Sequence, residues 1–217
     1  MPKWVKFIIA IALLPVCAGA ARALWLVVQR CGGLDTTWVP LLAGAACWVI
    51  IFLALPKPML IYVFGHELTH ALWTWLFWGK VKKMKISSAG GQVVISKTNF
   101  LITLAPYFFP LYVVLVVLGF ALGHWIWNWH GYLVYFHLVV GAAYAFHVTL
   151  TLHVLQTQQS DVISQGWLFS GVVIFLGNVC VLLCGLPLLT AKVGVLDSLG
   201  CWFESTGMIF LWLQKVL

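Results

Sequence analysis

A chain of 217 residues with 63% hydrophobic residues, 8% charged residues and a mean hydropathy of +1.04 cannot form a water-soluble domain with a polar surface. It carries 12 basic and 5 acidic residues, which gives a formal net charge of +7. The basic residues gather at the ends of apolar segments and between Lys80 and Lys97, a pattern that favours contact with anionic lipid headgroups over nucleic-acid binding. We therefore expect an integral membrane protein.

Long apolar segments recur along nearly the whole chain, and each is long enough to cross about 30 Å of hydrocarbon. Helices are expected there, because a backbone in lipid must satisfy its hydrogen bonds within the segment and no porin-like alternation is visible. We predict an all-α polytopic membrane protein, a bundle of about six transmembrane helices in a single domain over residues 1–217. The segments are 5–28, 38–55, 59–78, 100–122, 131–155 and 167–190, with a shorter apolar tail at 201–216.

The N-terminal segment has features of a secretory signal, with Lys3 and Lys6 before an apolar run and small residues around Arg22. The apolar stretch resumes directly after these small residues, so we favour an uncleaved first span over a cleaved signal. The six cysteines form no Cys-x-x-Cys pair, and most sit inside apolar runs. We expect them to be small buried hydrophobic residues.

The third predicted helix contains His66-Glu67-Leu68-Thr69-His70. Histidines four residues apart project from the same helical face, where two imidazole nitrogens can hold one Zn²⁺ ion. Of the five acidic residues, Glu67 is the one that lies well inside a predicted span. A carboxylate in that position costs several kcal/mol when the helix inserts into the membrane, so its presence indicates a function. In soluble enzymes with this spacing, the glutamate takes a proton from the metal-bound water. The alternative is a chance match in which the histidines are hydrogen-bonded core or pore residues.

A catalytic zinc site usually has three protein ligands and one open position, so a further ligand is needed. Asp161 is the favoured candidate because it follows a predicted span in a polar segment, just before the next apolar run. Its alternative role is to cap the helix that begins after it. His147 or His153, on the preceding span, could replace it as a ligand. The remaining acids fit turn, capping or interfacial roles: Asp35, Asp197 and Glu204.

Residues 80–96 differ from the rest of the chain, because two short β-prone runs flank Gly90 and Gly91. We predict a small hairpin at the membrane surface with its turn at these glycines. A basic interfacial loop is equally compatible with the residues.

Taken together, these motifs resemble the site-2-protease family of intramembrane zinc metalloproteases, in its compact bacterial-type form. The likeness covers about residues 59–170, the predicted core of the domain. Typical members carry Leu-Asp-Gly around the third ligand, where this chain has Ser160-Asp161-Val162. The matching features are His66-Glu67-x-x-His70-Ala71, then Gly90-Gly91 in the following hairpin, Leu104-Ala-Pro-Tyr-Phe-Phe-Pro110 opening the next span, and Asp161 one span later.

The resemblance implies a membrane-embedded zinc endopeptidase that hydrolyses a peptide bond in or near a transmembrane segment of another protein. His66, His70 and Asp161 would hold Zn²⁺, Glu67 would be the general base, and an edge of the hairpin could hold the substrate by strand addition. A partner protein could regulate cleavage, although the sequence names none.

The resemblance also implies a bacterial cell membrane and an active site open to the cytoplasm. The lysines of residues 80–97 favour the same orientation by the positive-inside rule, whereas Lys3 and Lys6 favour the opposite one.

Two other functions remain open at the level of sequence. One is a non-proteolytic membrane carrier of metal ions or protons, in which His66, Glu67, His70 and Asp161 bind ions in transit. The other is a catalytically silent family member that binds client helices. Glu67 discriminates between the endopeptidase and the carrier, because hydrolysis requires a base that is not a ligand, whereas transport could survive Glu67→Gln if the metal still bound.

Overall fold

The structure is a computed structural model of the chain, and it describes residues 1–33, 35–88 and 90–216. The described residues are mostly helical, with one two-stranded antiparallel sheet, which is compatible with the predicted all-α membrane protein. Contacts between Cα atoms divide the chain into two compact units. Unit 1 comprises Met1–Leu34 and Ser160–Leu217, and unit 2 comprises Asp35–Gln159.

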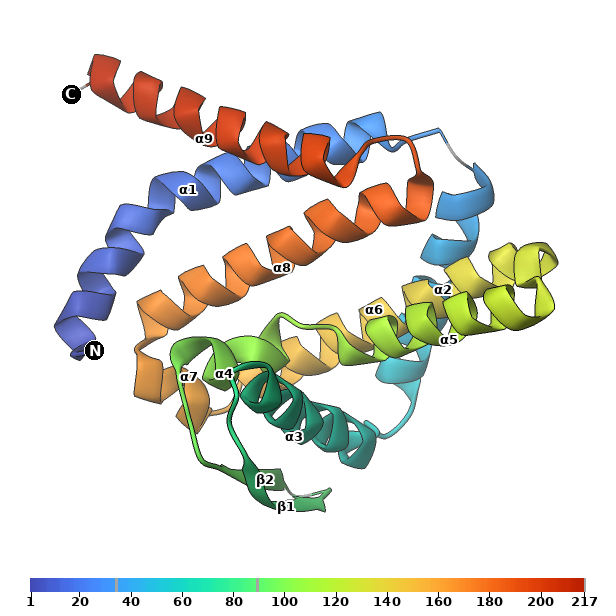
Figure 1. The fold of residues 1–217 in the computed structure, drawn as a ribbon, viewed down its shortest axis with the longest axis horizontal. Helices are drawn as coiled ribbons and strands as arrows, with labels where there is room; N and C mark the ends of the chain where they lie inside the picture. Colours follow the sequence, from blue (N-terminus) through green and yellow to red (C-terminus); the bar gives the residue numbers. More distant parts are fainter. Residues whose placement is uncertain (34, 89, 217) are drawn as a thin grey trace. The chain divides into compact units, whose positions relative to one another are not determined.

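Unit 1 is built on a long first helix, α1, which packs against both α8 and α9 (Figure 1). A Cβ atom on Gly19 of α1 would collide with Thr206 of α9, so glycine allows the two backbones to approach closely. Arg22 also donates a hydrogen bond of 3.1 Å to the hydroxyl of Ser205. The helices of this unit are α1 (Lys3–Arg30), α7 (Ser160–Gln165), α8 (Trp167–Thr190) and α9 (Val195–Val216).

Unit 2 contains the remaining helices and the sheet. Its helices α2 and α6 pack side by side. A Cβ atom on Gly141 would collide with the backbone of Leu41, so a glycine again allows two helices to approach closely. The indole of Trp48 donates a 2.8 Å hydrogen bond to Thr149 across the same pair. The elements are α2 (Asp35–Ala54), α3 (Met59–Leu76), β1 (Val81–Ser87), β2 (Gly90–Ile95), α4 (Phe100–Leu104), the 3-10 helix η1 (Ala105–Tyr107), α5 (Leu111–Trp127), η2 (Trp129–Tyr132) and α6 (Leu133–Leu155).

Four helical segments among the described residues are long and apolar enough to cross a membrane, or five if a bent pair forms one span. Six were predicted. The helix predicted at 59–78 is present as α3, but it is not among the candidate spans, because His66, Glu67 and His70 lower its hydropathy. The four segments are Lys3–Arg30, Thr36–Ala54, Trp129–Leu155 and Trp167–Thr190, and the bent pair is Phe100–Tyr107 with Leu111–Trp127.

The segment predicted as one span at 100–122 is broken in the structure. The helical pieces on either side of residues 108–110 meet at an angle of 77°. Pro106 and Pro110 explain the break, because proline has no N–H for the helix ladder and disfavours helical backbone at the residue before it. The chain therefore turns sharply between η1 and α5.

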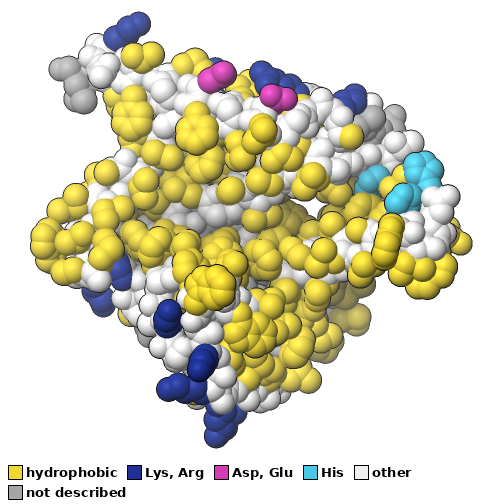
Figure 2. All heavy atoms as spheres, viewed as in Figure 1, with side chains coloured by type: hydrophobic (Ala, Val, Ile, Leu, Met, Phe, Trp, Pro, Cys, Tyr) yellow, Lys and Arg dark blue, Asp and Glu magenta, His cyan; other side chains and the backbone are white. Residues whose placement is uncertain are grey.

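The predicted hairpin is present, with β1 and β2 paired antiparallel. Its turn is not where the glycines predicted it, because Gly90 and Gly91 belong to β2 and pair with Ser87 and Ile86. Ala89, between the strands, lies outside the described residues. Basic side chains gather over the hairpin in Figure 2, and the lysines of β1 are exposed. Ile86 packs in the opposite direction, against the buried Tyr62, Val63 and Leu150.

Candidate metal centre

Two imidazoles lie together on one face of α3. The ring centroids of His66 and His70 are 4.9 Å apart, with the rings at 79° to each other. Four residues of α-helix amount to slightly more than one turn, which places the two side chains about 40° apart around the axis. His70 is buried, with 7% of its surface exposed, and His66 is half-buried. The helical spacing thus produces the pair that the sequence indicated.

The neighbouring backbone fixes the orientation of His70. Its Nδ1 lies 2.8 Å from the carbonyl oxygen of Ile102. Because a carbonyl oxygen can only accept a hydrogen bond, Nδ1 carries the proton and Nε2 keeps a lone pair for a metal. The side chain of Asn99 in turn accepts a 2.8 Å hydrogen bond from the amide of Ile102 and caps α4. Asn99 and Ile102 therefore fix which ring nitrogen of His70 carries the proton.

His66 is held between aromatic rings. The ring centroid of Tyr107 lies 5.2 Å from that of His66, nearly perpendicular to it, and that of Tyr62 lies 5.9 Å away. Tyr107 is fully buried and belongs to η1, the segment before the bend. The break between α4 and α5 therefore has a structural role, because it places Ile102 against one histidine and Tyr107 against the other.

Glu67 lies against the hairpin. It is buried, with 6% of its surface exposed. A Cβ atom on Gly91 would lie 2.5 Å from its Cγ and 2.7 Å from its Oε1, so β2 passes the carboxylate at a distance that glycine alone permits. Val63, one turn earlier on α3, meets the same glycine. An extended strand is thus held directly beside the carboxylate.

Asp161 is the second residue of α7 and is half-buried. It lies in the first turn of this short helix, where the helix dipole favours a carboxylate. His66 and His70 belong to unit 2 and Asp161 belongs to unit 1, and these three side chains are the ligand group that the sequence predicts. Two imidazole nitrogens and one carboxylate oxygen form a donor set that suits a catalytic zinc ion. Glu67 does not belong to the group.

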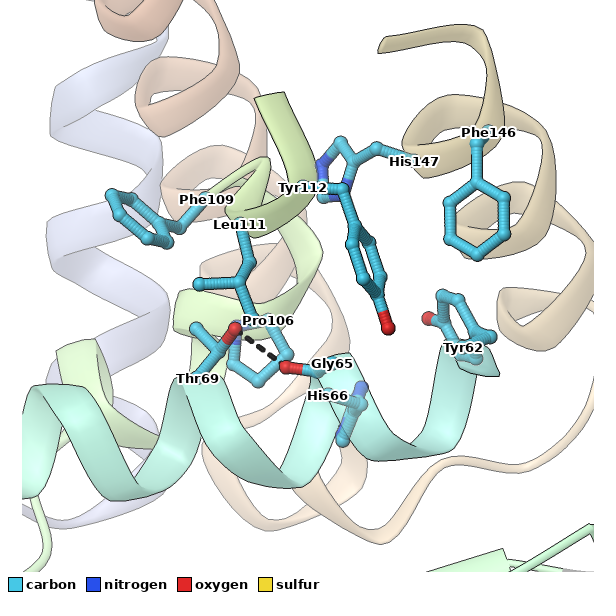
Figure 3. A pocket seen from close by; sticks show the side chains of 10 residues that line it. All are labelled: Tyr62, Gly65, His66, Thr69, Pro106, Phe109, Leu111, Tyr112, Phe146 and His147. Carbon is cyan, nitrogen blue, oxygen red and sulfur yellow. Dashed lines mark hydrogen bonds between the residues drawn. The ribbon is translucent and has the colours of Figure 1, made fainter. Parts of the chain in front are cut away.

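The two alternative ligands, His147 and His153, are also outside this group. His153 packs edge-on against Phe52, with ring centroids 6.1 Å apart. His147 lines a small cavity together with His66 (Figure 3).

The other acidic residues are placed elsewhere. Asp197 lies in the first turn of α9 beside Gly194, and Glu204 is exposed on the same helix. The side chain of Asp35 lies outside the described residues. No disulfide joins the six cysteines.

Three residues next to the histidines and Glu67 were not identified from the sequence as parts of the site. The carbonyl oxygen of Ile102 contacts His70, and the ring of Tyr107 packs nearly perpendicular to that of His66. Gly91 has no side chain, which leaves room for Glu67. Gly91 and Tyr107 lie within two motifs of the family resemblance, Gly90-Gly91 and the segment 104–110, but neither motif indicates these contacts. The prolines around Tyr107 mark a break in the helix without showing which residues the break brings together.

Comparisons with known proteins gave no matching protein-family model, no matching curated protein and no matching solved structure.

Proposed function

We propose that this chain is a membrane-embedded zinc endopeptidase that hydrolyses a peptide bond in or near a transmembrane segment of another protein, as its resemblance to site-2 proteases implies. One observation carries the proposal. The two paired imidazoles of α3 are accompanied by a buried carboxylate, Glu67, which is outside the group that could hold the metal. Hydrolysis requires such a base that is not a ligand, whereas ion transit does not.

The residues present fit a zinc ion. His66, His70 and Asp161 would hold it, and the contact of His70 with Ile102 leaves Nε2 available as a ligand. A zinc ion in such a site lowers the pKa of its bound water to about 7 and polarises the carbonyl of the bond to be cut.

Glu67 acts as general base in this proposal. Its carboxylate accepts a proton from the attacking water and later gives that proton to the nitrogen of the leaving amine. Burial against Gly91 restricts the positions of the carboxylate. A base held in one place reacts more readily than one that must first be ordered, because the entropy of positioning has already been lost.

The hairpin supports binding of an extended substrate. Carbonyls of a transmembrane helix are shielded by their own hydrogen bonds, so the segment to be cut must first unwind. β2 passes directly over Glu67, and the sheet has two strands among the described residues, which leaves the outer edge of β2 open for strand addition. An unwound segment paired with this edge would lie next to the base.

We further propose a bacterial cell membrane as the location, with the site opening to the cytoplasmic side. The exposed lysines of the hairpin support this orientation. Regulation by a partner protein is compatible with the proposal.

The test compares the zinc content and the cleavage of a transmembrane substrate for purified protein in detergent. Wild type is expected to bind one zinc ion and to cleave. Glu67→Gln should keep the metal and lose cleavage, and Asp161→Ala should lose both. Glu204→Gln, an exposed acid of α9, is the matched control and should behave as wild type. Zinc bound by wild type without any cleavage would favour the carrier, and wild type that neither binds supplied zinc nor cleaves would favour the silent client-binding protein. Unchanged cleavage by Glu67→Gln would contradict the role of Glu67 as the base.

A further inference from the structure

A small cavity lies next to the histidine pair, within unit 2. Its volume is about 20 Å³, and residues of α3, α5, α6 and the segment around η1 line it. Figure 3 shows His66 on the α3 side, with His147 projecting from α6 toward Tyr112. A cavity of this volume holds one water molecule, or one oxygen atom of a ligand.

Three polar side chains of the cavity wall can be compared by their hydrogen bonds: Thr69, Tyr112 and His147. The hydroxyl of Thr69 donates a 2.7 Å hydrogen bond to the carbonyl oxygen of Gly65, and the hydroxyl of Tyr112 donates one to Ile61. Both are therefore engaged with the backbone of α3. The Nε2 atom of His147 is buried and has no hydrogen-bond partner among the described residues. The side chain of His147 has 7% of its surface exposed.

A buried imidazole nitrogen without a hydrogen-bond partner needs an explanation. A buried polar atom without a partner destabilises the fold, and native structures keep such atoms mainly where water, an ion or a substrate satisfies them. Nε2 of a neutral imidazole is a donor or an acceptor according to tautomer. The cavity beside His147 has room for the single oxygen atom that would satisfy it.

The cavity and the hairpin lie on opposite flanks of the histidine pair. Successive residues of an α-helix are about 100° apart, so Glu67 projects to one side of His66 and Thr69 to the other. Glu67 meets Gly91 of the hairpin, whereas Thr69 and His66 line the cavity. A reaction centre held by His66 and His70 would therefore have the carboxylate on one flank and His147 on the other.

We propose that His147 is a second catalytic residue of this site, whose Nε2–H donates a hydrogen bond to the carbonyl oxygen of the bond being cut. The inference rests on the proposed function. As the oxygen of water bonds to the carbonyl carbon, the π electron pair moves onto the carbonyl oxygen, and Glu67 takes the water proton. When the C–N bond breaks, that proton passes to the nitrogen. His147 keeps its own proton throughout and stabilises the oxygen while it is negative.

The test compares His147→Leu, which removes the donor, with His147→Gln, whose amide N–H can reach the same position. The matched control is His137→Leu. His137 lies on the same helix with the same 7% exposure and also has a ring nitrogen without a partner, but it does not line the cavity. Three quantities are measured: kcat for a transmembrane substrate, zinc content, and the Kd of a phosphonamidate peptide, whose charged oxygen imitates the developing anion.

We expect kcat of His147→Leu to fall by about 10² to 10³-fold, the usual effect of removing one such donor. Zinc content should stay at the wild-type level, and the Kd of the phosphonamidate should rise by a similar factor. His147→Gln should recover part of both losses, and His137→Leu should match wild type.

Three results would overturn the inference: loss of zinc from His147→Leu, which would make His147 a ligand; an unchanged phosphonamidate Kd; or equal losses in His137→Leu, which would indicate a general packing effect. These results differ from failure of the proposed function, in which wild type itself neither cleaves nor binds the phosphonamidate.

Discussion

Gly91 defines how closely the hairpin approaches the proposed base. Its missing side chain leaves room for Glu67, since an added Cβ would lie 2.5 Å from the Cγ atom of the glutamate. We expect Gly91→Ala to displace the carboxylate or to lift β2, and a displacement of about 1 Å at a reaction centre can reduce the rate about 10²-fold. Zinc content should not change. The measurement is the cleavage rate beside that of Gln92→Ala, an exposed neighbour that should retain activity; equal rates for the two variants would argue against a role for this contact.

Asn99 acts on His70 through one backbone group. It caps α4 by accepting a hydrogen bond from Ile102, whose carbonyl oxygen contacts Nδ1 of His70. Asn99→Ala should lower stability by about 1 kcal/mol, as for other helix caps. It should also weaken zinc binding by about 10-fold, because the outer partner of a ligand is lost. Competition with a zinc chelator measures the affinity. Asn99→Asp keeps the helix cap and should therefore keep the wild-type zinc affinity. If Asn99→Ala loses stability but keeps the zinc affinity, the cap does not influence metal binding.

At the scale of elements, the long apolar helices were the easiest to predict. The segments predicted at 5–28, 131–155 and 167–190 lie within a few residues of α1, α6 and α8, because an unbroken apolar run of this length has few other conformations in a membrane. The hairpin was also predicted, but its turn was misplaced, because glycine favours both a turn and a close contact. In this hairpin, Gly91 serves the close contact with Glu67 and lies within β2, not in the turn.

The bend before α5 and its consequences were not predicted. Prolines mark a break in a helix, but the direction of the chain beyond it depends on packing against α3. The sequence predicts His66, Glu67 and His70 as site residues from their spacing, and Asp161 from its segment, while the contacts that surround the histidines came from the structure. The assignment of Zn²⁺ and of its ligands stays a prediction.

The open edge of β2 provides a test of strand addition. Ser96 donates from its amide to Lys80 across the hairpin, so alternation along the strand points the N–H of Val94 toward β1 and that of Val93 toward the open edge. Proline is tolerated where the missing N–H faces away from the ladder. Val93→Pro should therefore leave the hairpin formed but reduce cleavage strongly, by raising the KM for substrate. Val93→Thr retains the N–H and serves as the control; full activity of Val93→Pro would contradict substrate pairing at this edge.

For the whole molecule, the described helices support an integral membrane protein, and the orientation is testable. The exposed lysines of the hairpin favour a cytoplasmic position by the positive-inside rule. Cysteine placed at exposed Ser88 in the hairpin should react with an impermeant maleimide from the cytoplasmic side. Cysteine at exposed His130, beyond the far end of α5, should react from the opposite side. Wild type gives the background from native cysteines. The reverse labelling pattern would place the hairpin outside the cytoplasm.

The central claim is that this chain hydrolyses a peptide bond with Glu67 as the base. The most direct measurement is mass spectrometry of the products formed from a transmembrane substrate by purified, zinc-supplied protein in water enriched in ¹⁸O. We expect one heavy oxygen atom at the new carboxyl terminus with wild type, and no product with Glu67→Gln despite retained zinc. Absence of product from zinc-loaded wild type, or labelled product formed equally well by Glu67→Gln, would contradict it.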